Sequence, residues 1–414
     1  MGQYRCAPNG TTFETKDRAA NSFRESARSV FNVCVSLGIG YSGKELTSNR
    51  SIVLSYFVYI VSVLLVINSV WGLLDSFTTY AETRSAALSE QAAWLLAEKE
   101  LYESAKILVT SDDKKRRVCT VCSDRKEGEK KPVFLFVHGS MARMGQYASL
   151  MKLADDAGYN YVSYDFYGMG RSPKPTEKPW CYTTEMHLND LISVYRHTTA
   201  LFPSQPVIVV GHSYGCSLVL RLSMLLNNPM LDRVDLAALP PPSALVLLGA
   251  YRWDASSSRS KTMVRFFSLP LWLLRVIRPW LSAGFKTRAF APETLMDKEL
   301  QSVINYAEAL SGANAFHVVQ PFYVDSGKQT LHALSLAKVC FPPTFFVTGE
   351  SDKLAVPEEA SKLSKLIGSS SKGVSVIQRA GHQVMEERPA QVFAVLKEAV
   401  AAVAIKSPGF RDEN

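Results

Sequence analysis

The chain has 414 residues, enough for one large α/β domain of about 270 residues with additional segments. Hydrophobic residues make up 47% and charged residues 20%, the proportions of an ordinary globular protein. The net charge of +8 does not indicate a nucleic-acid partner, because the basic residues lie mostly in the first 50 residues, at 114–117 and at 252–288, where long apolar side chains are interleaved. We expect these basic residues to contact an anionic membrane surface instead.

The seven cysteines form no pattern that indicates a metal site. Cys119 and Cys122 make a single C-x-x-C, with no second pair and no pair of histidines nearby. A structural zinc site needs four such ligands, so we interpret these two residues as structural thiols. We predict neither a metal nor an organic cofactor.

The first 50 residues are polar and basic, and we expect most of this segment to be disordered. Residues 51–74 follow without a single charged side chain. As a helix this run would be about 36 Å long, enough to cross a hydrocarbon layer of about 30 Å, and Trp71 would lie at its interface. The run is too long and too uniformly apolar to be typical of a buried core helix. A cleaved signal peptide would begin earlier in the chain. The sequence therefore predicts a transmembrane anchor at 51–75.

The charges around this predicted anchor indicate its orientation. The basic residues before it, counted from residue 16, are Lys16, Arg18, Arg24, Arg28, Lys44 and Arg50. Arg84 is the one basic residue among the 20 residues that follow. Because basic residues favour the cytosolic side of a membrane, we expect the N-terminus in the cytosol and the larger part of the chain in a lumen or outside the cell. The basic group at 114–117 weakens this asymmetry.

Beyond the predicted anchor the pattern changes to that of an α/β domain. Residues 86–106 have an amphipathic helical pattern rich in Ala, Leu and Glu, which begins within a connecting segment at 76–105. Alternation of strands with helices is typical of a mostly parallel sheet covered on both faces. We assign this domain to residues 106–405 and a short tail to 406–414. Strand-like runs lie at 106–110, 117–121, 133–137, 159–164, 207–210, 244–248, 344–348 and 374–378, with helical patterns between most of them.

One stretch of the domain carries a specific turn. The buried strand at 207–210 is followed by Gly211-His212-Ser213-Tyr214-Gly215 and then by a helical run at 216–226. In this context G-x-S-x-G forms a nucleophile elbow, in which a Cβ at either glycine would collide with the neighbouring strand or helix. We expect Ser213 to hold a strained backbone conformation with its hydroxyl above the sheet.

Two more reactive residues follow predicted strands. Asp352 comes after the strand at 344–348, and His382 comes after the strand at 374–378. Ligands bind beyond the carboxyl ends of parallel strands, so these positions suit a functional site. The chain order Ser213, Asp352, His382 is the order that the α/β-hydrolase fold uses.

Four motifs occur together in the domain: H-G-S at 138–140, D-x-x-G-x-G-x-S at 165–172, G-H-S-Y-G at 211–215, and the late G-x-x-D and G-H that end at Asp352 and His382. Jointly they resemble the motifs of α/β-hydrolase-fold serine hydrolases, and they are similar to those of the membrane-anchored alpha/beta-hydrolase-domain-containing proteins. The resemblance implies a mostly parallel eight-stranded sheet with helices on both faces and a helical lid insertion. We expect the remaining polar side chains of the motifs to make loop hydrogen bonds; these are His138, Asp165 and His212.

The resemblance also implies a role for each residue. Ser213 would be the nucleophile, His382 the base that removes its proton, and Asp352 the acid that orients the histidine. The backbone N–H groups of Ser140 and Tyr214 would form the oxyanion hole. Asp254, just after the strand at 244–248, is an alternative triad acid, in which case Asp352 would only cap a helix.

An insertion at about 253–340 interrupts the strand pattern where such enzymes carry a lid. Residues 252–288 hold eight basic residues and one acid, with large apolar residues among them. Trp272 and Trp280 in this stretch suit the headgroup level of a bilayer, and we predict that they contact it. The alternative is an ordinary cap helix that packs on the core with solvated arginines.

Together these features predict a membrane-anchored serine hydrolase that cleaves carboxylic esters through an acyl-Ser213 intermediate. The expected substrate is a small-molecule ester, a lipid or monoacylglycerol in particular. An acyltransferase that uses the same acyl-enzyme is an alternative. A catalytically silent protein that binds a lipid or a partner is another, which the complete set of three residues disfavours.

Overall fold

The computed structural model describes residues 56, 58–64, 66–67, 93–110, 115–124, 131–176, 179–227, 236, 239–274, 284–332 and 336–406. The predicted tail at 1–50, most of the predicted anchor at 51–75 and the first part of the connecting segment lie outside these residues. Residues 56, 58–64 and 66–67 are helical. Within the described part of the chain, no helix combines the length and the apolarity that crossing a membrane requires.

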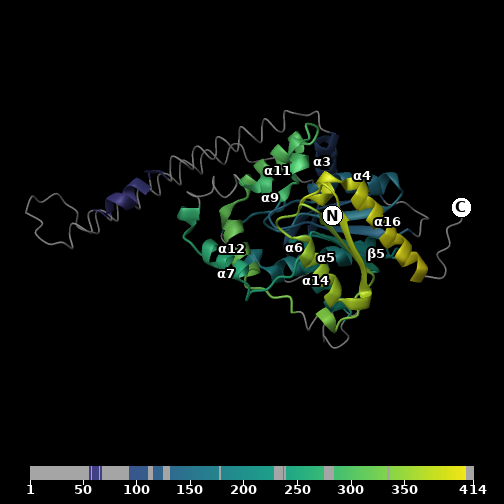
Figure 1. Cartoon of the computed structure of the whole chain (residues 1–414). Helices are drawn as coiled ribbons and strands as arrows, with labels where there is room; N and C mark the ends of the chain where they lie inside the picture. Colours follow the sequence, from purple (N-terminus) through teal and green to yellow (C-terminus); the bar gives the residue numbers. More distant parts are fainter. Residues whose placement is uncertain are drawn as a thin grey trace, which may run out of the picture.

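An eight-stranded sheet forms the centre of the molecule (Figure 1). Its spatial order is β1-β2-β4-β3-β5-β6-β7-β8. Strand β2 runs antiparallel to both of its neighbours, and every other neighbouring pair is parallel. The prediction of a mostly parallel eight-stranded sheet is therefore confirmed. The strands are β1 Lys106–Val109, β2 Arg117–Cys122, β3 Val133–Val137, β4 Asn160–Tyr164, β5 Val207–His212, β6 Ala244–Leu248, β7 Thr344–Gly349 and β8 Ser371–Ile377.

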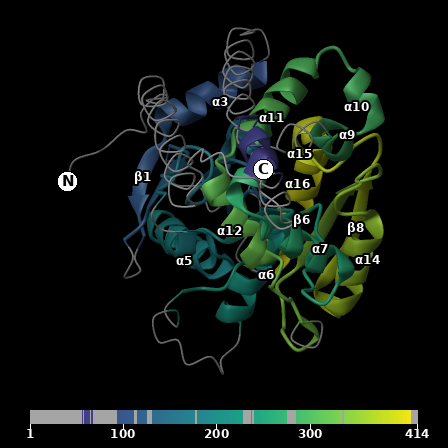
Figure 2. The ribbon, with the colours of Figure 1, turned by 90° about the vertical axis from the view of Figure 1, so that its left-hand side faces the viewer.

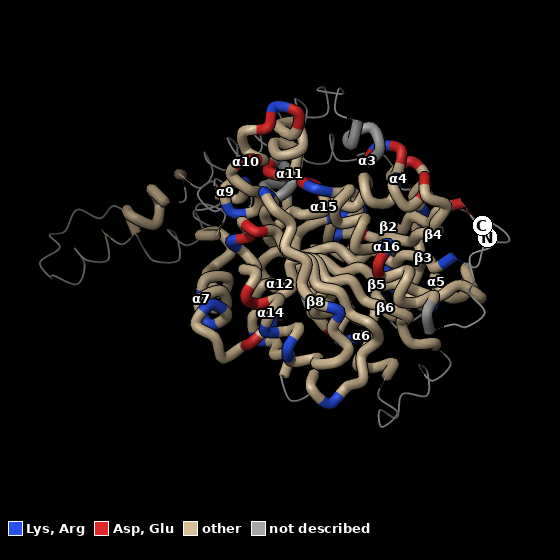
Figure 3. Tube along the Cα trace, turned by 45° about the vertical axis from the view of Figure 1, so that its right-hand side comes forward, with Lys and Arg blue, Asp and Glu red and all other residues tan. Residues whose placement is uncertain are grey.

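Helices cover both faces of the sheet because its central strands are apolar on both sides. Every residue of β3, β5, β6 and β7 is buried, and none of them is charged (Figure 3). In β3, Val133, Leu135 and Val137 face one core while Phe134 and Phe136 face the other. The first core is closed by α5 Thr184–Leu201, α6 Tyr214–Leu226 and α14 Pro357–Leu366. The second is closed by α3 Ala93–Ser104, α4 Ala148–Asp156 and α16 Pro389–Lys406.

A group of helices lies between β6 and β7 in the chain, in the range where the sequence predicts an insertion at about 253–340. Figure 2 faces the end of the molecule at which these helices gather, with α7, α9 and α12 in front of the sheet. Its described helices are α7 Ser258–Phe267, α9 Phe285–Ala289, α10 Pro292–Met296, α11 Gln301–Ala313 and α12 Phe316–Ser326. Shorter elements elsewhere are η1 Met144–Tyr147, η2 Pro179–Tyr182, η3 Gly368–Ser370 and α15 Val384–Glu387.

The last strand begins earlier than its sequence pattern predicts. The apolar run indicates a strand from residue 374, whereas β8 starts at Ser371 because Ser371 pairs with Thr344 of β7. β8 is an edge strand, and its first residues are polar and partly or fully exposed. Pairing with a neighbour, which hydrophobic periodicity does not detect, decides where such a strand begins.

Candidate active site

Ser213 lies in the tight turn between β5 and α6. Its backbone has φ +51° and ψ −116°, a strained conformation for a residue with a side chain. A Cβ at Gly211 would lie 3.0 Å from the backbone nitrogen of Cys216, and one at Gly215 would lie 2.4 Å from the carbonyl oxygen of Val137. Both glycines are therefore required for the helix to begin this close to the strands.

Asp352 and His382 meet beyond the ends of β7 and β8. The Nδ1 atom of His382 lies 2.8 Å from Oδ2 of Asp352, and both residues are buried. The other carboxylate oxygen, Oδ1, accepts hydrogen bonds from the amides of Leu354 at 2.8 Å and Ala355 at 2.7 Å. With the carboxylate anchored in this way, Nδ1 of His382 faces a fixed acceptor, and Nε2 is the ring nitrogen left for chemistry.

Asp254, the alternative acid, is held by different groups. Its Oδ1 accepts hydrogen bonds from the amide and the hydroxyl of Ser256 at 2.8 and 2.6 Å, and Oδ2 lies 3.4 Å from Arg252. The structure thus places Asp352, rather than Asp254, beside His382.

The loop that carries Ser140 packs directly against Ser213. A Cβ on Gly139 would lie 3.3 Å from Cβ of Ser213. Tyr214 is the first residue of α6, so its amide lies at the helix N-terminus, where backbone N–H groups lack intrahelical acceptors. The predicted oxyanion donors therefore come from two segments that both adjoin Ser213.

Two further motif histidines hold loops together, as predicted. Nε2 of His212 lies 3.0 Å from the carbonyl oxygen of His382, and its Nδ1 lies 3.3 Å from the side-chain nitrogen of Gln146. His138 accepts a hydrogen bond from the amide of Phe166 at 3.0 Å. Burial lowers the pKa of His138 to about 3, and burial together with the neighbouring His382 lowers the pKa of His212 well below its usual value. Both rings are therefore neutral and structural at physiological pH.

Asp165 anchors its glycine-rich turn, also as predicted. One carboxylate oxygen accepts a hydrogen bond from the amide of Met144 and the other from the amide of Arg171, each at 2.7 Å. The hydroxyl of Tyr102, on α3, lies 3.1 Å from both oxygens. The sequence did not predict this last contact, which joins α3, in the segment before the predicted domain, to a motif loop.

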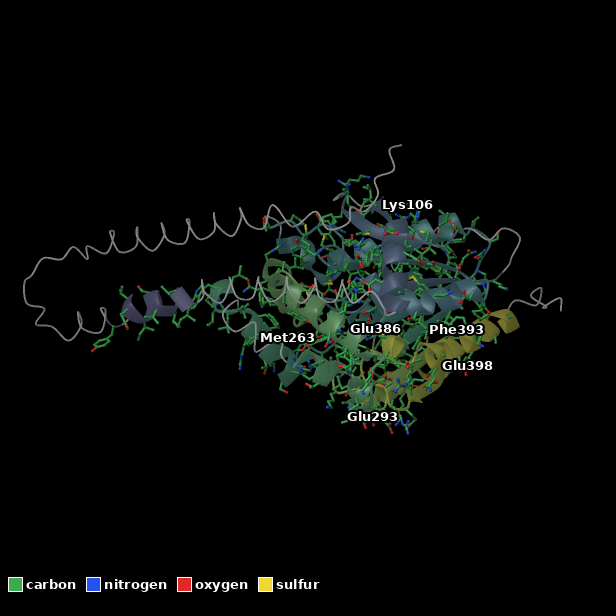
Figure 4. All side chains as sticks on the ribbon, turned by 90° about the horizontal axis from the view of Figure 1, so that it is seen from above. Lys106, Met263, Glu293, Glu386, Phe393 and Glu398 are labelled. Carbon is green, nitrogen blue, oxygen red and sulfur yellow. The ribbon has the colours of Figure 1, made fainter. Side chains whose placement is uncertain are left out.

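A cavity of about 830 Å³ opens above Ser213. Ser140, Ser213 and His382 line it on the side of the sheet, and Met263 of α7 and Glu386 of α15, both labelled in Figure 4, line it elsewhere. Much of the remaining wall is apolar and comes from the insertion; this part includes Phe266, Phe267, Phe285, Phe316 and Val319. Among the residues that the structure describes, no group of three His, Cys, Asp or Glu side chains could hold a metal ion.

Of the two tryptophans predicted to contact a bilayer, the structure describes one. Trp272 follows α7 and is 40% exposed. Trp280 lies outside the described residues. Contact with a bilayer stays a prediction for both tryptophans.

Comparison with known families identifies the chain. The family described as "Serine aminopeptidase, S33" (Hydrolase_4) matches residues 128–389, more than half of the sequence. The chain belongs to this family of α/β hydrolases. A comparison with curated proteins found no match.

Solved structures share the fold at low sequence identity. A thermophilic esterase from Thermogutta terrifontis is 19% identical, with 72% of this chain and 98% of that chain covered and a TM-score of 0.57. An esterase from Exiguobacterium antarcticum is 17% identical, with coverage of 71% and 98% and a TM-score of 0.54. A bromoperoxidase from Bacillus anthracis is 19% identical, with coverage of 71% and 99% and a TM-score of 0.54. This likeness shows the α/β-hydrolase fold itself.

The steric fit at the elbow makes a prediction for stability. We expect Gly215→Ala to destabilise the protein by about 3 kcal/mol or more, because a Cβ 2.4 Å from the carbonyl oxygen of Val137 forces the strand and helix apart. Gly284→Ala is the control, since its Cβ would meet nothing closer than Arg288 at 3.6 Å. Chemical denaturation measures both, and equal midpoints would contradict the steric argument.

Glu386 makes a prediction for pH dependence. Burial raises its pKa from 4.5 to about 7, against the opposing effect of Arg143. Between pH 4.5 and about pH 7 the carboxyl of Glu386 is protonated in the folded protein but ionised in the unfolded chain. The free energy of unfolding therefore falls as the pH rises through this range. Glu386→Gln should therefore gain stability relative to the wild type across this window, by at most about 3 kcal/mol.

Urea unfolding at several pH values measures this difference. Glu398→Gln, on an exposed position of α16 (Figure 4), is the control for losing an acid. If both variants follow the wild-type pH profile in parallel, the prediction for Glu386 is wrong.

Proposed function

We propose that this protein is a serine hydrolase that cleaves carboxylic esters through an acyl-Ser213 intermediate. The observation that carries the proposal is the 2.8 Å contact between His382 Nδ1 and Asp352 Oδ2, beside a cavity that Ser213 and His382 both line. Membership in an α/β-hydrolase family supports a hydrolytic reaction in general.

In the proposed mechanism, the hydroxyl oxygen of Ser213 attacks the ester carbonyl while Nε2 of His382 accepts the hydroxyl proton. Asp352 stabilises the imidazolium that forms. The amides of Ser140 and Tyr214 hydrogen-bond the oxyanion, and each such donor contributes about 3–4 kcal/mol in the transition state. The imidazolium gives its proton to the leaving alcohol. Water then cleaves the acyl-enzyme by the same sequence, which releases the acid and restores Ser213.

The shape of the cavity supports a lipid ester as the substrate. About 830 Å³ is at the upper end of the range for small-molecule sites, and the aromatic wall supplied by the insertion suits an acyl chain. Part of this wall belongs to a small core in which Leu274, Phe316 and Val319 are buried against residues of α7 and its following loop. In our proposal the insertion is the lid, and a monoacylglycerol or a similar lipid ester enters beneath it.

Exposed apolar groups support attachment to a membrane. Tyr56, Tyr59, Ile60 and Val66 are between 53% and 67% exposed, which suits a lipid environment better than water. The basic residues of α7 (Figure 3) precede the exposed Trp272 in the insertion and suit anionic headgroups. We propose an anchor at 51–75 and a lid that rests on the bilayer, with the N-terminus cytosolic as the charge distribution predicts.

The proposed function is tested by labelling the full-length protein with a fluorophosphonate probe. We expect strong labelling of the wild type and none of Ser213→Ala. Asp352→Asn should lower the rate of ester hydrolysis about 10³- to 10⁴-fold, because the histidine loses its orienting anion. Asp254→Asn, the matched control, should keep the rate within a few-fold of wild type.

Substrate class is tested with the same variants. Monoacylglycerol, a short aryl ester and an aminoacyl arylamide are compared, the last because the family is described as a peptidase. Cleavage of the arylamide alone would overturn the ester proposal. An unlabelled, folded wild type would overturn the hydrolase proposal.

Membrane contact of the lid is tested on a shortened chain that begins at residue 76. We expect it to sediment with vesicles that contain anionic lipid. Trp272→Ala or Trp280→Ala should each weaken partitioning about tenfold, as expected for the loss of about 1.5 kcal/mol of aromatic burial. Val109→Ala, an exposed residue at the β1 edge, is the control. Unchanged binding in both tryptophan variants would contradict the proposed lid contact.

A further inference from the structure

A buried ion pair joins the loop that carries Ser140 to helix α3. Arg143 lies three residues after Ser140, and Glu98 lies on α3. Nε of Arg143 donates to Oε1 of Glu98 at 2.6 Å, and Nη2 donates to Oε2 at 3.0 Å. Both residues are at most 9% exposed. Two parallel hydrogen bonds of this kind set both the position and the orientation of the guanidinium.

The backbone of the loop is packed closely against the same carboxylate. A Cβ at Gly145 would lie 2.4 Å from Oε1 of Glu98, so only glycine leaves room for the acid at this place. The next residue, Gln146, contacts His212, and the amide of Met144 donates to Asp165. Consequently the segment after Ser140 is held at several successive residues, and Glu98 reaches it from α3, outside the sheet.

Arg143 also contacts the two other segments that enclose the site. Its guanidinium lies 5.0 Å from the ring centre of Tyr306, on helix α11 of the insertion. Its Nη2 lies 3.8 Å from Glu386, which follows His382 by four residues. In Figure 4 Glu386 lies where the insertion meets the C-terminal helices. One charged group therefore connects α3, the insertion, the Ser140 loop and the segment that carries His382.

Stability alone is a poor explanation for such a group. A buried ion pair is often no more stabilising than apolar residues of the same volume, whereas it fixes one geometry. Fixed geometry is what an oxyanion hole needs, because a displacement of about 1 Å at a catalytic group costs about 100-fold in rate.

We propose that Glu98 and Arg143 are positioning residues for the oxyanion hole: their buried pair sets the place of the Ser140 amide relative to Ser213. The inference rests on the proposed function, since it assigns these residues to the same reaction. Neither residue belongs to the four sequence motifs, and neither reaches the acyl group in the proposed mechanism.

The test compares two variants of the full-length protein that each break one buried pair. Glu98→Gln keeps the shape of the side chain but removes the charge that holds Arg143. Asp190→Asn is the matched control, because Asp190 pairs with Arg116 at 2.7 Å, both side chains are at most 2% exposed, and the pair joins α5 to the segment before β2. Active enzyme is counted by fluorophosphonate titration, and folding is checked by thermal unfolding.

We expect Glu98→Gln to lower kcat on a short aryl ester about 10- to 100-fold per titrated site, with KM within about threefold of wild type. Its affinity for a trifluoromethyl ketone, which binds as an oxyanion, should fall by the same factor as kcat/KM. Asp190→Asn should keep both values within about threefold. Gly145→Ala, which displaces the Glu98 carboxylate, should reproduce the catalytic loss.

Wild-type kcat per titrated site in Glu98→Gln would overturn the positioning role and leave the hydrolase proposal intact. An equal loss in Asp190→Asn would also overturn it, since any buried pair would then have the same effect. If the folded wild type neither reacts with the probe nor cleaves the ester, the proposed function fails and this inference fails with it.

Discussion

The close approach of α6 to β3 at Gly215 is the constraint on which the site depends. The α-carbon of Gly215 faces the carbonyl oxygens of Val137 and His138 so closely that a single methyl group would lie about 2.4–2.5 Å from them. This contact brings the helix N-terminus, the end of β5 and the loop after β3 to one point. It also imposes the strained backbone of Ser213, whose strain is balanced by the burial of the flanking apolar strand and helix. The order of the sheet then places the ends of β6, β7 and β8 in succession beside this point.

Around the turn, buried polar groups hold each loop at a defined place. His138 and His212 stay neutral because burial disfavours their charged forms, so each ring can donate with one nitrogen and accept with the other. Asp165, Glu98 and Arg143 are buried as well, and hydrogen bonds with neighbouring groups satisfy their polar atoms. An unsatisfied buried group would cost about 1–3 kcal/mol, so these networks select one arrangement of the loops rather than add much stability.

The sequence predicted the strands accurately wherever they are buried on both faces. β3 and β6 have the expected boundaries, and β5 and β7 extend the expected ranges by one or two residues, because continuous β-branched and aromatic runs leave little ambiguity. The edge strand β8 was predicted less well, since pairing decides its start. In the site, the motifs and their chain order indicated Ser213 and His382. They left two candidates, Asp352 and Asp254, for the acid that pairs with the histidine. Only the folded positions of their loops distinguish these two acids.

The sequence by itself determined the central sheet and the nucleophile turn at the end of β5. Burial of apolar residues governs the strands, and local sterics at the glycines govern the G-x-S-x-G turn. It did not indicate Glu98, Arg143 or Glu386. Glu98 lies in a helical segment whose charges look solvent-exposed in the sequence, and it is buried only because α3 packs against the loop after β3, 45 residues further along the chain. Such a pairing has no local signature, since an ion pair across this distance depends on how two elements pack. Tertiary structure alone therefore decided which charges enclose the site and which loops they hold.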